Sequence, residues 1–240
     1  MIGEIKNQLG ETLDYTLHSG GKNDSRIVVL GHGVTGNKDR PFIVALAEGL
    51  ARAGLDCLRF SFSGNGLSGG RFTESNISKE VEDLGAVLDA LATRKVCYVG
   101  HSMGAAVGVI RASMDSRIRC LVSLAGMVHT KAFAEREFGS VQPDHGFMWD
   151  DTKCPLSSSY MKDMAKIGNV LEKAATIHVP WLLVHGEEDD VVPLQDSLEI
   201  FDRAAQPKEL VRLPGANHVF AGEHQPLMVA KVVEWIRSEF

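Results

Sequence analysis

The residues best suited to chemistry in this sequence are a serine, a run of acids and a histidine that lie far apart along the chain. Ser102 stands between Gly100 and Gly104 in the spacing Gly-x-Ser-x-Gly. Four consecutive acids occupy positions 187–190, and His218 follows them. This chain order of serine, acid and histidine is typical of a nucleophilic serine carried on a sharp turn between a strand and a helix.

The residues around the serine fit such a turn. An apolar run at 96–99 precedes it, and small residues at 105–108 follow it. Glycine on either side of Ser102 permits a tight turn and a close approach of helix to strand. The hydroxyl would then lie over the first turn of a helix, whose free N–H groups favour a developing negative charge. An ordinary glycine-rich connection has the same spacing, so the rest of the chain must decide between the two interpretations.

A serine hydroxyl is a poor nucleophile at neutral pH unless a base accepts its proton and a carboxylate orients that base. We expect both partners in loops after later strands. His218 lies in the loop after the last predicted strand, whereas His224 falls in the opening turn of the next helix. The acids at 187–190 also follow a predicted strand. His101 is next to the serine, but we expect its side chain to point away from Ser102 and to serve packing.

Attack on a carbonyl also requires two N–H donors that stabilise the resulting oxyanion. The residue after the nucleophile, Met103, supplies one of them. The second is expected from the glycine-rich loop after the strand at 27–30.

Alternating strands and helices must bring these residues together. Six short apolar runs predict strands at 27–30, 57–62, 96–99, 118–124, 181–185 and 210–213, and residues 1–18 predict a pair of edge strands. Helices are predicted near 41–53, 76–94, 103–114, 194–205 and 224–239. Continuously apolar strands are buried on both faces, which indicates an α/β fold with a mostly parallel sheet flanked by helices. Active sites in such sheets lie beyond the carboxyl ends of the strands.

One interval, 127–177, lacks a convincing core strand. It is rich in aromatic residues and methionines, among them Phe133, Trp149 and Tyr160. A long insertion at the carboxyl edge of the sheet predicts a small helical lid that shapes an apolar pocket. The alternative is that these side chains only attach the insertion to the body. We expect residues 1–240 to form one domain that contains this insertion.

Five motifs in order extend over nearly the whole chain. They are His32–Lys38, Arg59–Ser68, Gly100–Gly104, His185-Gly186-x-x-Asp189-x-x-Val192-Pro193 and Gly215-Ala216-Asn217-His218. In these motifs the sequence resembles the α/β-hydrolase superfamily, in particular small-lidded serine esterases of the cinnamoyl- or feruloyl-esterase and monoacylglycerol-lipase kinds.

The resemblance implies an α/β-hydrolase fold and assigns roles to single residues. The family's His-Gly-x-x-Asp pattern selects Asp189 as the acid that orients the base, beside Ser102 and His218. The resemblance also indicates the N–H of Val34 as the second oxyanion donor, with His32 and Gly33 holding the shape of that loop. Related esterases often carry an aromatic residue where this chain has Val34.

Composition excludes several classes of partner. The 25 basic and 31 acidic residues among 240 are spread along the chain, which disfavours nucleic acid and anionic membranes. No apolar run is long enough to span a bilayer, and we expect no leader segment. The four cysteines lack Cys-x-x-Cys spacing and predict reduced thiols in a cytoplasmic protein. The pattern indicates no metal site and no cofactor, and the oligomeric state is not readable.

We therefore predict a serine hydrolase, a carboxylesterase that cleaves small to medium uncharged acyl or aryl esters through an acyl-enzyme on Ser102. Its expected partner is a small-molecule ester. An acylglycerol lipase, a thioesterase or a serine aminopeptidase would use the same parts, and Asp144, Asp150 and Asp151 are weak candidates for binding a peptide amine. The alternative outside enzymes is a receptor that binds a ligand on a hydrolase fold.

Overall fold

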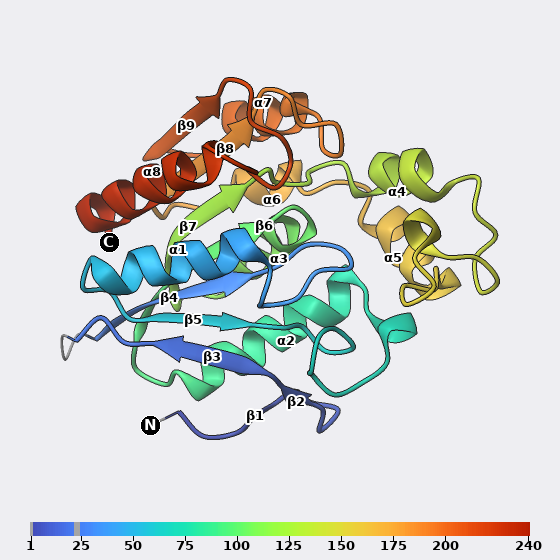
Figure 1. Cartoon of the computed structure of the whole chain (residues 1–240), viewed down its shortest axis with the longest axis horizontal. Helices are drawn as coiled ribbons and strands as arrows, with labels where there is room; N and C mark the ends of the chain where they lie inside the picture. Colours follow the sequence, from blue (N-terminus) through green and yellow to red (C-terminus); the bar gives the residue numbers. More distant parts are fainter. Residues whose placement is uncertain (1, 22–24) are drawn as a thin grey trace.

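A twisted, mostly parallel sheet forms the centre of the protein in this computed structural model (Figure 1). The structure describes residues 2–21 and 25–240, so Met1 and residues 22–24 of the predicted domain lie outside the described residues. Within these residues the sheet has seven strands in the order β3-β5-β4-β6-β7-β8-β9. They are β3 (Tyr15–His18), β4 (Arg26–Gly31), β5 (Cys57–Phe60), β6 (Lys95–His101), β7 (Ile118–Leu124), β8 (Trp181–Gly186) and β9 (Lys208–Leu213). Strand β3 pairs antiparallel with β5, and the other pairs are parallel.

Helices cover both faces of the sheet. Helices α1 (Pro41–Arg52) and α8 (His224–Glu239) contact each other on one face, and α2 (Ile77–Ala90), α3 (Met103–Ala112) and α7 (Leu194–Arg203) lie on the other. Successive strand residues alternate between the two cores, as the period of two in a strand requires. Val29 and Tyr98 pack towards α2 and α3, while Val28 and Val99 pack towards α1 and α8. The predicted α/β architecture is confirmed.

The interval between β7 and β8 is helical. It contains α4 (Thr130–Phe138), the short 3₁₀ helix η2 (Met148–Asp150), α5 (Ser158–Ile167) and α6 (Leu171–Ala174). In Figure 1, α4 and α5 lie at one end of the molecule, beyond the carboxyl ends of the central strands. Helices α4 and α5 contact each other, and α5 also contacts α2. The insertion therefore stands at the edge where the site is expected.

Two local predictions need correction. The N-terminal segment forms three strands rather than a pair, because β1 (Ile5–Lys6) and β2 (Thr12–Leu13) make a small sheet of their own before β3. Strand β5 ends at Phe60 rather than at residue 62. The N–H of Phe62 donates to His32 Nε2 at 3.0 Å, so it is not available to a neighbouring strand.

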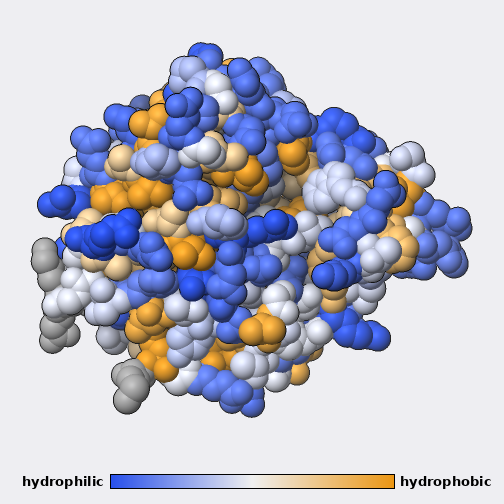
Figure 2. All heavy atoms as spheres, viewed as in Figure 1, coloured by the Kyte–Doolittle hydropathy of each residue, from blue (hydrophilic) through white to orange (hydrophobic). Residues whose placement is uncertain are grey.

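The surface in view is mostly hydrophilic, with apolar side chains interspersed over α1 and α8 (Figure 2). In the part of the chain that the structure describes, no helix combines the length and the apolar character needed to cross a bilayer.

Candidate functional site

Ser102 occupies a strained turn between β6 and α3. Its φ of 54° and ψ of −120° are unusual for a residue with a side chain. The packing around it explains the two glycines of the motif. A Cβ on Gly100 would lie 2.3 Å from the carbonyl oxygen of Gly104, and a Cβ on Gly104 would lie 2.4 Å from that of His32. The turn therefore needs both glycines, as the sequence predicts.

The structure brings Asp189 and His218 together across 29 residues of sequence. His218 Nδ1 lies 2.8 Å from Asp189 Oδ2. The Asp189 side chain is fully buried and the His218 side chain is 12% exposed. Because the carboxylate accepts the Nδ1 proton, the neutral ring keeps Nε2 free to accept another proton. This is the tautomer that a general base for serine requires.

A second histidine, which the sequence analysis named only as part of a motif, also contacts the acid. His185 Nε2 lies 3.3 Å from Asp189 Oδ2, and the N–H groups of Val191 and Val192 donate to Oδ1 at 2.9 Å. Burial opposes ionisation of this carboxyl. The hydrogen bonds from His185 and His218 outweigh burial, and they hold the pKa of Asp189 well below its usual range. Asp189 is thus a fixed anion beneath the His218 ring.

The other candidate acids and the other candidate base do not take part in the contact between His218 and Asp189. Glu187 pairs with Arg212 at 2.7 Å, and Asp190 is exposed. His224 Nε2 donates to the carbonyl of Pro214 at 3.1 Å, at the start of α8. Among the four acids, the buried contact with His218 belongs to Asp189.

Ser102 and His218 line one pocket of about 320 Å³, together with Val34. The Ser102 hydroxyl donates no hydrogen bond to His218 in the described residues. Bonds between a nucleophile and its base are often long until substrate is bound. The structure therefore brings the predicted serine, base and acid to one place, with the serine facing the same cavity as the base.

The loop after β4 packs directly against the serine. A Cβ on Gly33 would lie 2.7 Å from Ser102 Cβ and 3.2 Å from Ser102 Oγ, so only glycine fits there without a shift. His32 holds the loop as predicted: its Nδ1 donates to the carbonyl of Gly33 at 2.9 Å, while Nε2 accepts from the N–H of Phe62. Burial lowers the pKa of His32 to about 4, so the ring is neutral.

The two predicted N–H donors belong to the residues that follow the contacting pair, Met103 after Ser102 and Val34 after Gly33. Met103 is the first residue of α3, where helical N–H groups have no partner within the helix. Val34 follows Gly33 and lines the same pocket as Ser102. Both positions suit an oxyanion that forms at the serine.

His101 packs as expected and has a further contact with the base. Its ring lies between those of Phe42 and His218, with centroids 4.6 Å from each. Its Nε2 also donates to the backbone carbonyl of His218 at 2.9 Å. Burial lowers the pKa of His101 to about 3, so this ring stays neutral while it supports the base.

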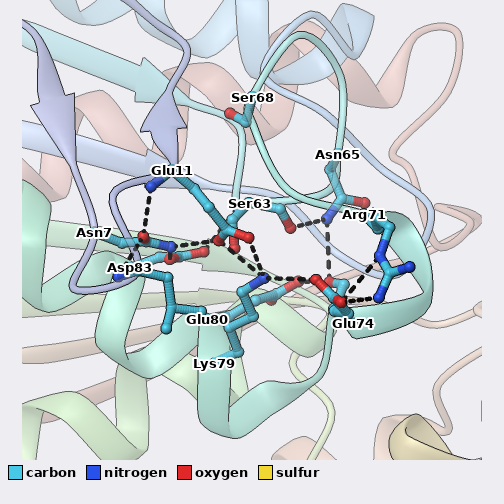
Figure 3. Close-up of polar contacts among 12 residues, drawn as sticks. Asn7, Glu11, Ser63, Asn65, Ser68, Arg71, Glu74, Lys79, Glu80 and Asp83 are labelled. Atoms are coloured by element: carbon cyan, nitrogen blue, oxygen red, sulfur yellow. Dashed lines mark hydrogen bonds and ion pairs between the residues drawn. The ribbon is translucent and has the colours of Figure 1, made fainter.

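A polar network braces the loops behind the site (Figure 3). Asp83 accepts from the N–H of Ser63 at 2.8 Å and from the Asn7 amide at 2.8 Å. Glu80 accepts from the Ser75 hydroxyl at 3.0 Å, while its other oxygen has no hydrogen-bond partner among the described residues. Burial, and then the charge of Asp83, raise the pKa of Glu80 well above its usual value. These hydrogen bonds attach the segment after β5, which includes Ser63 and Ser75, to α2 below the site.

The pocket has walls that sequence reasoning missed. Val191 and Val219, which follow the acid and the base in sequence, contribute apolar surface. Trp149, by contrast, was among the aromatic residues of the predicted lid, and it contributes a half-exposed ring. Phe42 and Arg40 come from the start of α1. The position of Arg40 and Phe42 just after the glycine-rich loop was the sequence signal that could have placed them at the pocket. Among the described residues, no three His, Cys, Asp or Glu side chains converge as a set of metal ligands.

Comparison with known proteins gives the family. The sequence model described as alpha/beta hydrolase fold matches residues 26–153, and one described as serine aminopeptidase, S33, matches residues 152–225. The ferulic acid complex of Est1E from Butyrivibrio proteoclasticus is similar in structure. It has a TM-score of 0.88 at 25% identity, over 99% of this chain and 98% of that one. Alpha/beta hydrolase domain-containing protein 10 from mouse has a TM-score of 0.82 at 20% identity, over 99% of each chain, which shows a common fold.

Curated sequences match over a smaller share of their own length. An uncharacterized protein of Mycobacterium tuberculosis is 29% identical over 205 residues, which are 83% of this chain and 64% of that protein. The human mitochondrial palmitoyl-protein thioesterase ABHD10 is 25% identical over 173 residues, 67% of this chain and 56% of that protein. The chain thus spans less than two thirds of the length of these relatives. Since the first family match extends over more than half of the sequence, this chain belongs to the α/β-hydrolase-fold family.

Proposed function

We propose that this protein is a serine carboxylesterase that cleaves small to medium esters with an uncharged acyl or aryl group. The bond between His218 and Asp189 is the observation that carries the proposal, because it sets the tautomer that a serine nucleophile needs. The strained turn at Ser102 and the apolar pocket it shares with His218 support it. So does the similarity to a structure described as an esterase with bound ferulic acid.

In the proposed reaction His218 Nε2 takes the Ser102 proton while the serine oxygen bonds to the ester carbonyl carbon. The N–H groups of Val34 and Met103 stabilise the oxyanion. When the intermediate collapses, the bond to the leaving oxygen breaks and Nε2–H protonates that oxygen. Water, activated in turn by His218, then releases the acid and regenerates Ser102.

The insertion at 127–177 acts in this proposal as a lid over the pocket of the single domain 1–240. Trp149 lines the pocket from this segment, and its indole N–H donates to Glu137 at 3.0 Å. The ring of Trp149 also packs on Phe138, with centroids 4.9 Å apart. The four free cysteines favour a reducing compartment such as the cytoplasm.

A thioesterase is the second candidate, because one relative is named as a palmitoyl-protein thioesterase. The same acyl-enzyme would form with a thiol as the leaving group. An aminopeptidase has less support. No carboxylate lines the pocket in the described residues, and Asp144 accepts from the N–H of Ser158 outside it. A substrate ammonium would therefore lack a counter-ion.

A substrate panel tests the proposal. The rate of hydrolysis would be measured for wild-type protein and for Ser102→Ala. The substrates are p-nitrophenyl esters of rising chain length, methyl cinnamates, a monoacylglycerol, an acyl thioester and an aminoacyl anilide. We expect ester turnover that falls by about 10⁶ in kcat in the variant. Faster cleavage of the thioester or anilide would reassign the class. A variant with wild-type ester turnover would refute the serine mechanism, and a protein that cleaves nothing would favour the receptor alternative.

A further inference from the structure

Arg40 places a positive charge in the wall of the pocket that holds Ser102. It precedes Pro41, the first residue of α1, and its side chain is exposed at the pocket rim. One guanidinium nitrogen, Nη2, donates to the carbonyl of Thr35 at 3.1 Å, in the loop that follows Val34. This bond holds the arginine head beside the proposed oxyanion site and leaves its other N–H groups for a ligand.

No carboxylate among the described lining residues offsets this charge. Among the described residues that line the pocket, Arg40 is the one with a permanent charge, and no ion pair joins it to a carboxylate. The neighbouring Asp39 is engaged by Lys38 and Arg59. The first turn of α1 has no acidic residue, so it supplies no carboxylate to the same rim.

The position of Arg40 indicates which half of a substrate it meets. The leaving group must lie on the side of His218, because that ring protonates the departing atom. The His101 ring contacts both the Phe42 ring and the His218 ring at tilted angles, and so connects the start of α1 to the base. Arg40 and Phe42 line the same pocket as His218, so a charged leaving group held on the side of His218 would come within reach of the pocket rim.

We propose that Arg40 recognises a negatively charged leaving group, so that the preferred substrate joins an uncharged acyl group to an alcohol or thiol bearing a carboxylate or phosphate. This inference rests on the proposed function and refines its substrate. A guanidinium pairs with both oxyanions through parallel N–H bonds, so the shared chemistry is an oxyanion held at the rim. Because Arg40 is exposed, the charged end stays near water and only the reacting ester bond is enclosed.

The test compares esters with one acyl group and three leaving groups: 3-hydroxybenzoate, 3-hydroxybenzamide and 3-hydroxyphenyl phosphate. The quantity measured is the ratio of kcat/KM for each charged ester to that for the neutral amide. Taking this ratio within each protein cancels general damage to folding or to the catalytic groups. The variants are Arg40→Gln, Arg40→Lys and Arg40→Glu. Arg52→Gln is the matched control, at the other end of α1, where Arg52 lies near Glu48.

We expect Arg40→Gln to lower the ratio about fivefold at low ionic strength, the size of a good exposed ion pair. Arg40→Glu should lower it further, Arg40→Lys should retain most of it, and Arg52→Gln should leave it unchanged. Added salt should shrink the preference of the wild type, since exposed charges are screened over about 10 Å at 0.1 M. Whichever charged ester shows the larger ratio identifies the oxyanion.

An unchanged ratio in both Arg40→Gln and Arg40→Glu would overturn the role of Arg40 even if all esters are cleaved. Failure of the proposed function looks different: neither charged nor neutral esters would be hydrolysed faster by wild type than by Ser102→Ala.

Discussion

Replacing Gly33 by alanine should slow ester hydrolysis about a hundredfold, because the new methyl group would collide with the nucleophile. An alanine Cβ at this position would lie 2.7 Å from Ser102 Cβ, whereas ordinary contacts begin near 3.4 Å. The loop or the serine must therefore move by about 0.7 Å to restore an ordinary contact. Gly33 does not have a positive φ, so steric displacement, rather than backbone strain, is the main effect of the change.

The size of the effect follows from what moves. Val34 is the next residue, so displacement of Gly33 also shifts the proposed oxyanion donor. A misplacement of about 1 Å can cost 10²-fold, and loss of one oxyanion donor costs about 10²–10³-fold in kcat. A hundredfold loss corresponds to about 2.7 kcal/mol of transition-state stabilisation.

The assay is steady-state hydrolysis of a p-nitrophenyl ester by Gly33→Ala, with the thermal midpoint measured in parallel. Gly3→Ala is the control, since a Cβ on Gly3 meets nothing within 4 Å. We expect a fall in kcat in a variant that is still folded at the assay temperature. Wild-type kcat in folded Gly33→Ala would refute the view that this loop must touch the serine.

Other changes give distinct results. Asp189→Asn should lower kcat about 10⁴-fold by offering the wrong hydrogen-bond partner to His218, while Asp190→Asn should have little effect; the reverse result would move the acid by one residue. His101→Phe should lower kcat about tenfold, because the carbonyl of His218 would lose its hydrogen bond from His101. The acid limb of the pH–rate profile should stay in place, because the pKa of His101 is only about 3. A shifted limb would show that His101 titrates in the reaction. Glu80→Gln should stabilise the protein more at pH 7 than at pH 5 in urea unfolding. The raised pKa of Glu80 gives stability that is present below about pH 4.5 and is lost above it by at most about 1.4 kcal/mol per pH unit. If the difference in unfolding free energy between Glu80→Gln and wild type does not change with pH, Glu80 is ionised in the folded protein.

Much of the fold was predictable because its signals are local. Runs such as Ile27–Leu30 are apolar and β-branched, and each is followed by a helical pattern, so sheet and crossovers could be assigned from neighbours in sequence. The edges were harder. The end of β5 depends on His32, some thirty positions away, which takes the N–H of Phe62. No pattern within the strand itself encodes that bond.

Some residues of the candidate site could also be predicted from local sequence, and others could not. The glycines around Ser102 have a steric reason that is visible in their spacing, and the loop positions of Asp189 and His218 follow from the strands before them. The contacts of His101 and His185 with these two residues were not predictable, because they depend on side-chain direction across the sheet edge. Arg40 was missed for the same reason, since only the fold brings the start of α1 to the pocket.

The central claim is that Ser102 is the nucleophile, and covalent labelling tests it most directly. The protein would be treated with a fluorophosphonate, digested, and the modified peptide identified by mass spectrometry. We predict one adduct, on Ser102, whose formation parallels the loss of esterase activity, and no adduct in Ser102→Ala. Esterase activity that survives complete exposure to the reagent, or an adduct on another residue that accounts for the inactivation, would contradict the account.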